Sequence, residues 1–177
     1  MPDTPIDRMY RDHAELIAYL DHEVQPTFRS LVDDNFKKSL TLAAASYFEH
    51  ELTKILLEFC NIVSHGHPEL TAFVRAKAVE RQYCTYFNWD SRNANNFFGL
   101  FGREFKLRAQ DRVKADAKLD EAIKAFLEIG ELRNRMVHED YAIFLQTKSA
   151  REVYDLYQLA LPFLVYVEAE LCVAGPP

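Results

Sequence analysis

Glycine and proline are both scarce in this sequence. Its 177 residues include five glycines and seven prolines, too few for the many tight turns of an all-β fold, so long helices are favoured. Cysteine is scarce as well: Cys60, Cys84 and Cys172 are odd in number and form no Cys-x-x-Cys pair. We therefore expect reduced thiols and a cytoplasmic location rather than a disulfide framework.

Long apolar runs are also missing. The longest, residues 159–167, falls far short of the ~20 residues of a membrane-spanning helix, and we interpret it as part of a buried core helix. The residues up to His13 carry no apolar stretch of the kind found in a secretory signal. The sequence thus predicts a protein that does not associate with a membrane.

The sequence has no overall excess of basic charge. The formal net charge is −6, which excludes a uniformly basic nucleic-acid-binding surface. Residues 71–118, however, carry ten basic and five acidic side chains, a net +5, between two segments of net −6 and −5. A polyanion, if one binds, should contact this middle segment, although a solvated helix face explains its charge equally well. The candidate RNA-binding residues are Arg103, Lys106, Arg108 and Arg112, with Arg135 further along the chain.

Apolar residues recur at helical spacing through most of the chain. This pattern predicts an all-α, up-and-down helical bundle that forms one domain over residues 1–177. An Asp-Asp-Asn run at 33–35 is a candidate break, Gly66 a candidate left-handed cap and Pro162 a candidate kink. Ser149 and Glu152 have the spacing of a capping box. The expected helices cover residues 4–23, 28–63, 69–82, 103–115, 120–138 and 149–172, with a short one between 93 and 102.

Aromatic residues are concentrated between residues 83 and 101. Such side chains can stack on nucleic-acid bases, but packing beneath a loop is the commoner use, and we favour it here. The seven residues are Tyr83, Tyr86, Phe87, Trp89, Phe97, Phe98 and Phe101.

Residues 119–138 form the most strongly patterned helix. At about 100° per residue, Leu119 and Phe126 lie with other apolar residues on one side, opposite charged ones. The pattern changes in the last turn and a half, where Arg133 and Asn134 fall within the apolar arc and His138 lies at its edge. An arginine on a core face is costly unless it is paired or lies at an interface. We therefore expect a small wet pocket around these three side chains.

The residues from Arg133 to His138 read Arg-Asn-x-x-x-His. This resembles the R-x4-H motif of the HEPN superfamily, in particular its RiboL-PSP-HEPN type. The motif lies late in the chain, at the end of an amphipathic helix that one more helix follows, as in that family. Residues 46–51 and the aromatic, asparagine-rich residues 86–102 also resemble it, so the likeness covers roughly residues 40–170.

The HEPN resemblance implies a homodimer that cleaves RNA without a metal or other cofactor. Attack by the 2′-OH would leave a 2′,3′-cyclic phosphate. Arg133 would bind the phosphate, His138 would transfer a proton and Asn134 would orient one of them. Arg133 and His138 are about 140° apart around one helix, so they can reach the same group if the helix ends at His138 or if a second copy of the chain faces the first across a cleft. The resemblance also implies a toxin–antitoxin or phage-defence setting, with an antitoxin or regulatory protein as partner.

One position departs from the toxin branch of the family. There a tyrosine follows the histidine by two residues, whereas here Asp140 occupies that place and Tyr141 comes next. This difference calls into question neutralisation by nucleotide transfer to that tyrosine. Glu139 and Asp140 also bring negative charge close to His138.

Other interpretations of these residues stay open. Arginine and histidine are favourable at a helix C-terminus for structural reasons alone. The domain could also be a non-catalytic dimerisation, protein-binding or nucleotide-binding module, which the acidic composition favours. No metal site is expected, since Cys60, His65 and His67 have no fourth ligand nearby.

Overall fold

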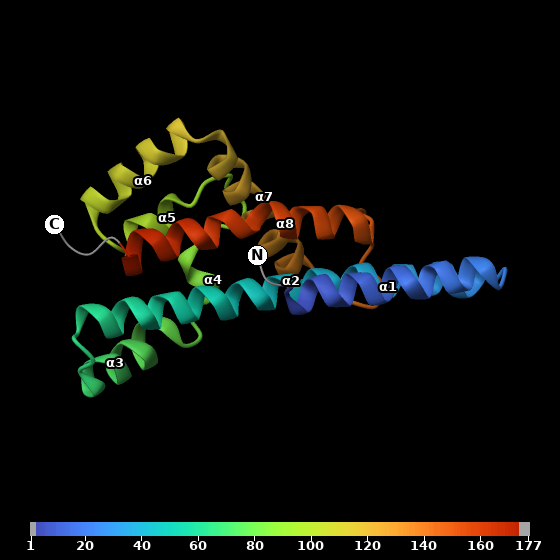
Figure 1. Cartoon of the computed structure of the whole chain (residues 1–177), viewed down its shortest axis with the longest axis horizontal. Coiled ribbons are helices and arrows are strands. Elements are labelled where there is room, and N and C mark those ends of the chain that lie inside the picture. The colour runs from blue at the N-terminus through green and yellow to red at the C-terminus, as the bar shows by residue number, and fades with distance from the viewer. Residues whose placement is uncertain (1–2, 174–177) are drawn as a thin grey trace. The chain divides into compact units, whose positions relative to one another are not determined.

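The computed structural model describes residues 3–173, and this part of the chain contains helices and no β-strand (Figure 1). The expected all-α fold is therefore confirmed. Two of the helical segments are π-helical turns that continue an α-helix. The α-helices are α1 (Pro5–His22), α2 (Pro26–Val63), α3 (Pro68–Val74), α4 (Tyr83–Tyr86), α5 (Asn95–Gly99), α6 (Arg103–Ala115), α7 (Ala117–His138) and α8 (Ala150–Glu168), and the π-helical turns are Arg75–Val79 and Ala169–Val173.

Helix α2 runs through all of its 38 residues without the break considered at 33–35. The two aspartates bind other side chains, because Asp33 lies 3.2 Å from His13 and Asp34 pairs with Lys37 at 2.7 Å. Asn35 donates to the carbonyl of Leu31, one turn earlier in the same helix. The helix ends at the expected place. Gly66 has a φ of +75° and its N–H donates to the carbonyl of Asn61, which confirms the left-handed cap.

The third helix differs from its prediction over residues 69–82. Its α-helical part ends at Val74, and the wider π-helical turn follows up to Val79. The hydroxyl of Tyr86 donates to the carbonyl of Ala78 at 2.6 Å, which binds this turn to the following segment. The periodicity of the sequence gives no sign of this contact. The prediction of one helix up to residue 82 was therefore wrong after Val74.

Side-chain caps fix the start of three helices. Thr4 and Asp7 form a capping box at α1, and Ser149 and Glu152 form the expected one at α8, with Ser149 N–H donating to the Glu152 carboxylate at 2.8 Å. Helix α7 begins three residues earlier than expected because the Asp116 side chain accepts hydrogen bonds from the first turn.

The chain forms two compact units. The first consists of the residues up to Tyr47 together with Ile129–Gln158. In it α1 lies along the first part of α2 (Figure 1), where the buried ring of His13 stacks on Phe36 with centroids 3.6 Å apart.

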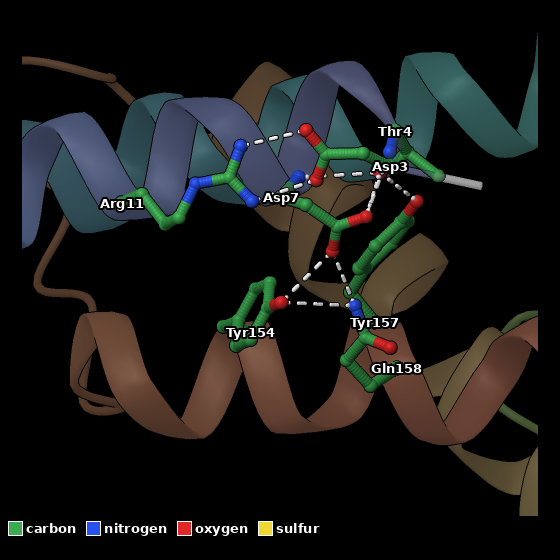
Figure 2. A network of polar contacts seen from close by, with 7 residues as sticks. All are labelled: Asp3, Thr4, Asp7, Arg11, Tyr154, Tyr157 and Gln158. Carbon is green, nitrogen blue, oxygen red and sulfur yellow. Dashed lines mark hydrogen bonds and ion pairs between the residues drawn. The ribbon is translucent and has the colours of Figure 1, made fainter. Parts of the chain in front are cut away.

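A polar network joins α1 to α8 within this first unit (Figure 2). The buried hydroxyl of Tyr157 donates to the Thr4 hydroxyl at 2.8 Å, and Tyr154 and Gln158 both donate to one carboxylate oxygen of Asp7. The same capping box that begins α1 therefore also anchors it to α8.

The second unit consists of Phe48–Glu128 and the residues from Leu159 onward. Its core is a cluster of phenylalanine rings in which Phe126 lies 4.9 Å from both Phe87 and Phe163. Five of the seven aromatic residues between 83 and 101 are buried, so packing is confirmed as their main role. The five are Tyr83, Tyr86, Phe87, Phe97 and Phe98.

Within residues 3–173, one helical stretch, Ala150–Val173, is long and apolar enough to cross a membrane by length and composition. The core helix of a globular domain meets the same test. Within residues 159–167, Ala160 and Phe163 are fully buried while Leu159 and Val165 are 43% and 47% exposed, so one side of this run forms the expected core.

Candidate active site

The last turns of α7 carry the three candidate catalytic residues. Leu132 and Met136 are buried, and this part of the helix belongs to the first unit. Arg133 and Asn134 are half-buried, and His138, the last residue of the helix, is exposed. The three polar side chains thus lie at the end of the apolar stripe, and the small wet pocket around them stays a prediction.

Arg133 and Asn134 are joined directly. The Nη1 of Arg133 donates to the side-chain oxygen of Asn134 at 3.1 Å. His138 follows Arg133 by five residues, an advance of about 7.5 Å and a rotation of about 140° along a helix. Asn134, four residues before His138, lies on the same side of the helix as the histidine, whereas Arg133 starts from a different side and reaches Asn134 through its long side chain.

The two acidic residues after His138 are engaged in local contacts. Glu139 pairs with Arg135 at 3.3 Å, and the carboxylate of Asp140 accepts a hydrogen bond from the N–H of Ala142 at 3.0 Å. These contacts partly offset the negative charge that the sequence places beside His138. Arg135, a candidate RNA-binding residue, is exposed and also lies over the ring of Phe144, 5.4 Å from its centroid.

Sequence reasoning missed a cation near the segment that follows the site. Lys38, on α2, donates to the carbonyl of Tyr141 at 3.1 Å, and its ammonium lies 5.2 Å from the centre of the Tyr141 ring. The two residues are 103 positions apart in the chain, and no local pattern links them. Lys38 therefore contacts the segment that follows α7 and brings a positive charge to it.

Large apolar side chains are exposed along the segment that begins at the end of α7. Val137 is 55% exposed, Ile143 75% and Leu145 83%. Tyr141, at 42%, lies between them in the chain. Apolar side chains at the end of α7 and in the segment after it are therefore exposed to solvent in the single chain.

The basic residues of α6 belong to the second unit. Arg103, Arg108 and Arg112 are exposed and Lys106 is half-buried. Arg112 pairs with Asp116 at 3.3 Å, and Arg108 lies 5.7 Å from the ring centre of Phe105. These four residues stay a predicted RNA-binding surface of the second unit, and their exposure and contacts fit a solvated helix face equally well.

Among residues 3–173, no three His, Cys, Asp or Glu side chains gather closely enough to hold a metal ion. The Cys60, His65 and His67 set considered from the sequence is therefore not assembled. His67 instead lies 3.2 Å from Glu69.

Comparison with known proteins identifies a family. The model of the family described as RiboL-PSP-HEPN matches residues 7–172, nearly the whole chain. No curated protein and no solved structure matches.

Proposed function

The chain belongs to the RiboL-PSP-HEPN family, and from this premise we propose that it is a metal-independent endoribonuclease. The reaction is an attack by a ribose 2′-OH on the adjacent phosphorus, which forms the 2′-O–P bond and breaks the bond to the 5′-oxygen. The products are a 2′,3′-cyclic phosphate and a 5′-OH end. Since the nucleophile belongs to the RNA, no metal-bound water is required.

Three residues of α7 have different roles in this reaction. Arg133 binds the non-bridging phosphate oxygens and stabilises the charge that accumulates on them in the transition state. His138 takes the proton from the 2′-OH, and a second acid, which we assign to His138 of the partner subunit, returns one to the 5′-oxygen. Asn134 is a positioning residue, because its side-chain oxygen accepts the hydrogen bond from Arg133.

One observation carries this proposal: a hydrogen-bonded Arg–Asn pair and an exposed histidine lie at the end of one helix. A purely structural helix C-terminus needs cations only for the helix dipole. It does not need an asparagine that accepts a hydrogen bond from the arginine on an otherwise apolar side of the helix.

The proposed homodimer rests on the exposed apolar segment beside the site. Ile143 and Leu145 are the most exposed of its apolar side chains, and a second copy that covers them would place its own α7 next to the first. We further propose that the enzyme acts in a toxin–antitoxin or phage-defence system in the cytoplasm, with an antitoxin or regulatory protein as its partner.

The test is cleavage of total RNA in excess EDTA. The wild-type chain is compared with Arg133→Ala, Asn134→Ala and His138→Ala, and with His22→Ala as a matched control, since His22 is an exposed histidine at the end of α1. We expect cleavage by the wild type and the control, loss with the Arg133 and His138 variants, and reduced cleavage with Asn134→Ala. Equal activity in all five proteins would contradict the assignment.

A non-catalytic module is the second candidate function, favoured by the net charge of −6. It predicts that the wild-type chain leaves RNA intact in EDTA. It also predicts that RNA or a nucleotide, if bound, is bound with an affinity that Arg133→Ala lowers and His138→Ala leaves unchanged.

A further inference from the structure

The second unit contains a cavity that the proposed nuclease reaction does not use. Its volume is about 560 Å³, within the range of about 300–1,000 Å³ of small-molecule sites. It lies among the C-terminal end of α2, α3 with its π-helical turn, α4, and the link between α5 and α6. Its walls are largely apolar, and Phe59, Leu70, Val74 and Leu100 are among them.

Lys77 is the one charged residue among those that line the cavity. It lies in the π-helical turn Arg75–Val79 and is exposed. Within residues 3–173 its ammonium makes no ion pair. A lysine at an apolar cavity without a carboxylate partner favours a ligand that brings a negative charge of its own.

The hydroxyl groups of the cavity have no O–H left to donate to a ligand, because each already donates within the protein. The hydroxyls of Ser64, Thr85 and Tyr86 donate to backbone carbonyls of the same unit. Gln82 accepts from Thr85 through its side-chain oxygen at 3.4 Å and has its amide N–H₂ left to donate. The cavity therefore offers two donors, Lys77 and Gln82, at the edge of an apolar space.

The backbone around the cavity is also irregular. The helix changes from α to π at Arg75, and Arg81, just after it, has a φ of +62°. Single π-helical turns are rare and occur often at functional sites. Here the π turn places Lys77, Ala78 and Val79 on the cavity wall.

We propose that this cavity binds a small amphipathic monoanion, an alkyl-chain carboxylate, with the chain among the apolar side chains and the carboxylate on Lys77 and Gln82. A cationic ligand would face Lys77 without any acidic residue to neutralise it. A multiply charged ligand such as a nucleotide would place further charges in an apolar space. A ligand with one negative charge can pair with Lys77, and its apolar chain can fill the rest of the cavity without placing a second charge there.

Dodecanoate is the probe, used with the full-length chain well below its micelle-forming concentration. Dodecan-1-ol and dodecylammonium are the matched neutral and cationic probes, and binding is measured by calorimetry. We expect dodecanoate to bind more tightly than the other two. Lys77→Glu should weaken dodecanoate binding by about fivefold or more and strengthen dodecylammonium binding, whereas Lys118→Glu, a change at an exposed lysine outside the lining, should alter neither.

The reactivity of Cys60 locates the ligand, because this half-buried thiol lines the cavity. In a chain that also carries Cys84→Ser and Cys172→Ser, dodecanoate should slow alkylation of Cys60 by iodoacetamide. Leu70→Trp, which enlarges a half-exposed wall residue, should weaken binding of dodecanoate while the circular dichroism spectrum stays unchanged.

Four results would overturn the proposal. They are the absence of dodecanoate binding, equal binding of the carboxylate and the alcohol, no effect of Lys77→Glu, and unprotected Cys60. If instead Leu70→Trp changes the mass in light scattering and dodecanoate does not bind, the cavity is a contact for a second copy. Because RNA cleavage in EDTA is measured separately, failure here leaves the nuclease proposal standing.

Discussion

Arg133 donates a hydrogen bond from its guanidinium to the side-chain oxygen of Asn134, the next residue of α7, over 3.1 Å. Successive residues of a helix point about 100° apart, so the long arginine side chain must bend toward its neighbour to make this contact. The bond fixes where the guanidinium lies before any substrate is bound. Such preorganised donors are what stabilise charge in a transition state.

Replacement of Arg133 by lysine tests this geometry. Lysine keeps the charge but lacks the planar fork that binds a phosphate through two donors. We expect Arg133→Lys to lower kcat for RNA cleavage roughly tenfold to a hundredfold, with a smaller change in KM. Steady-state kinetics on a defined RNA measures this, and Arg8→Lys, an exposed arginine on α1, is the control. If Arg133→Lys has the same kcat as the wild type, the positive charge at this position is sufficient for cleavage and the planar guanidinium is not required.

The exposed segment after α7 predicts an effect on assembly. Leu145 is 83% exposed in the single chain, so Leu145→Asp should leave the fold intact while it places a charge in the proposed dimer contact. We expect size exclusion with light scattering to show a dimer for the wild type and a monomer for the variant, with cleavage lost. Val24→Asp, at an apolar residue that is 80% exposed elsewhere, should remain dimeric. A wild-type chain that is monomeric at the concentrations of the cleavage assay would refute the shared site.

The contact between Tyr157 and Thr4 predicts an effect on stability. Tyr157→Phe removes a hydroxyl that donates at 2.8 Å within the interior, and a buried hydrogen bond of this kind contributes about 1 kcal/mol. We expect the free energy of unfolding, measured in urea, to fall by that amount. Tyr19→Phe, at a tyrosine that is 61% exposed, should change it by less than about 0.5 kcal/mol. A loss no greater than that of the control would mean that the hydroxyl adds nothing to the anchoring of α1.

Asp7 predicts how stability depends on pH. Burial alone would raise its pKa, but hydrogen bonds from the backbone and side chain of Thr4 and from Tyr154 outweigh it and hold the pKa below its ordinary value. A carboxyl group whose pKa is lowered by folding stabilises the protein above the unfolded pKa of about 3.9, and this contribution is lost as the pH falls through the folded value.

Asp7→Asn should therefore destabilise the chain most near neutral pH. The difference from wild type in the free energy of unfolding should shrink as the pH falls below about 4. Urea titrations at neutral and acidic pH measure it, with Asp12→Asn, an exposed carboxylate on the same helix, as the control. If the free energies of unfolding of wild type and Asp7→Asn differ by the same amount at both pH values, the titration of Asp7 does not contribute to the pH dependence of stability.

Much of the fold could be predicted because local signals were strong. The Thr4, Ser149 and Gly66 positions carry short-range capping and turn chemistry, and helix α6 begins and ends at the predicted residues, 103 and 115. The π-helical turn at Arg75–Val79 could not be predicted, because it coincides with a contact from Tyr86 that lies outside the helix.

The candidate site was predictable in part for a similar reason. The polar interruption of an apolar stripe pointed to Arg133, Asn134 and His138, all on one helix. Lys38 could not be found in this way, since it approaches Tyr141 from a helix about a hundred residues earlier. The cavity around Lys77 was also missed, because its walls come from segments that have no common pattern in the sequence.

The chemistry of the RNA ends tests the central claim most directly. A defined RNA is incubated with the wild-type chain in EDTA, beside the same RNA with one 2′-deoxy sugar at the cleavage position. We predict a 2′,3′-cyclic phosphate and a 5′-OH from the first and no cleavage at that position in the second, with no products from His138→Ala. Cleavage of the deoxy-substituted position, or a 3′-OH with a 5′-phosphate, would contradict the account.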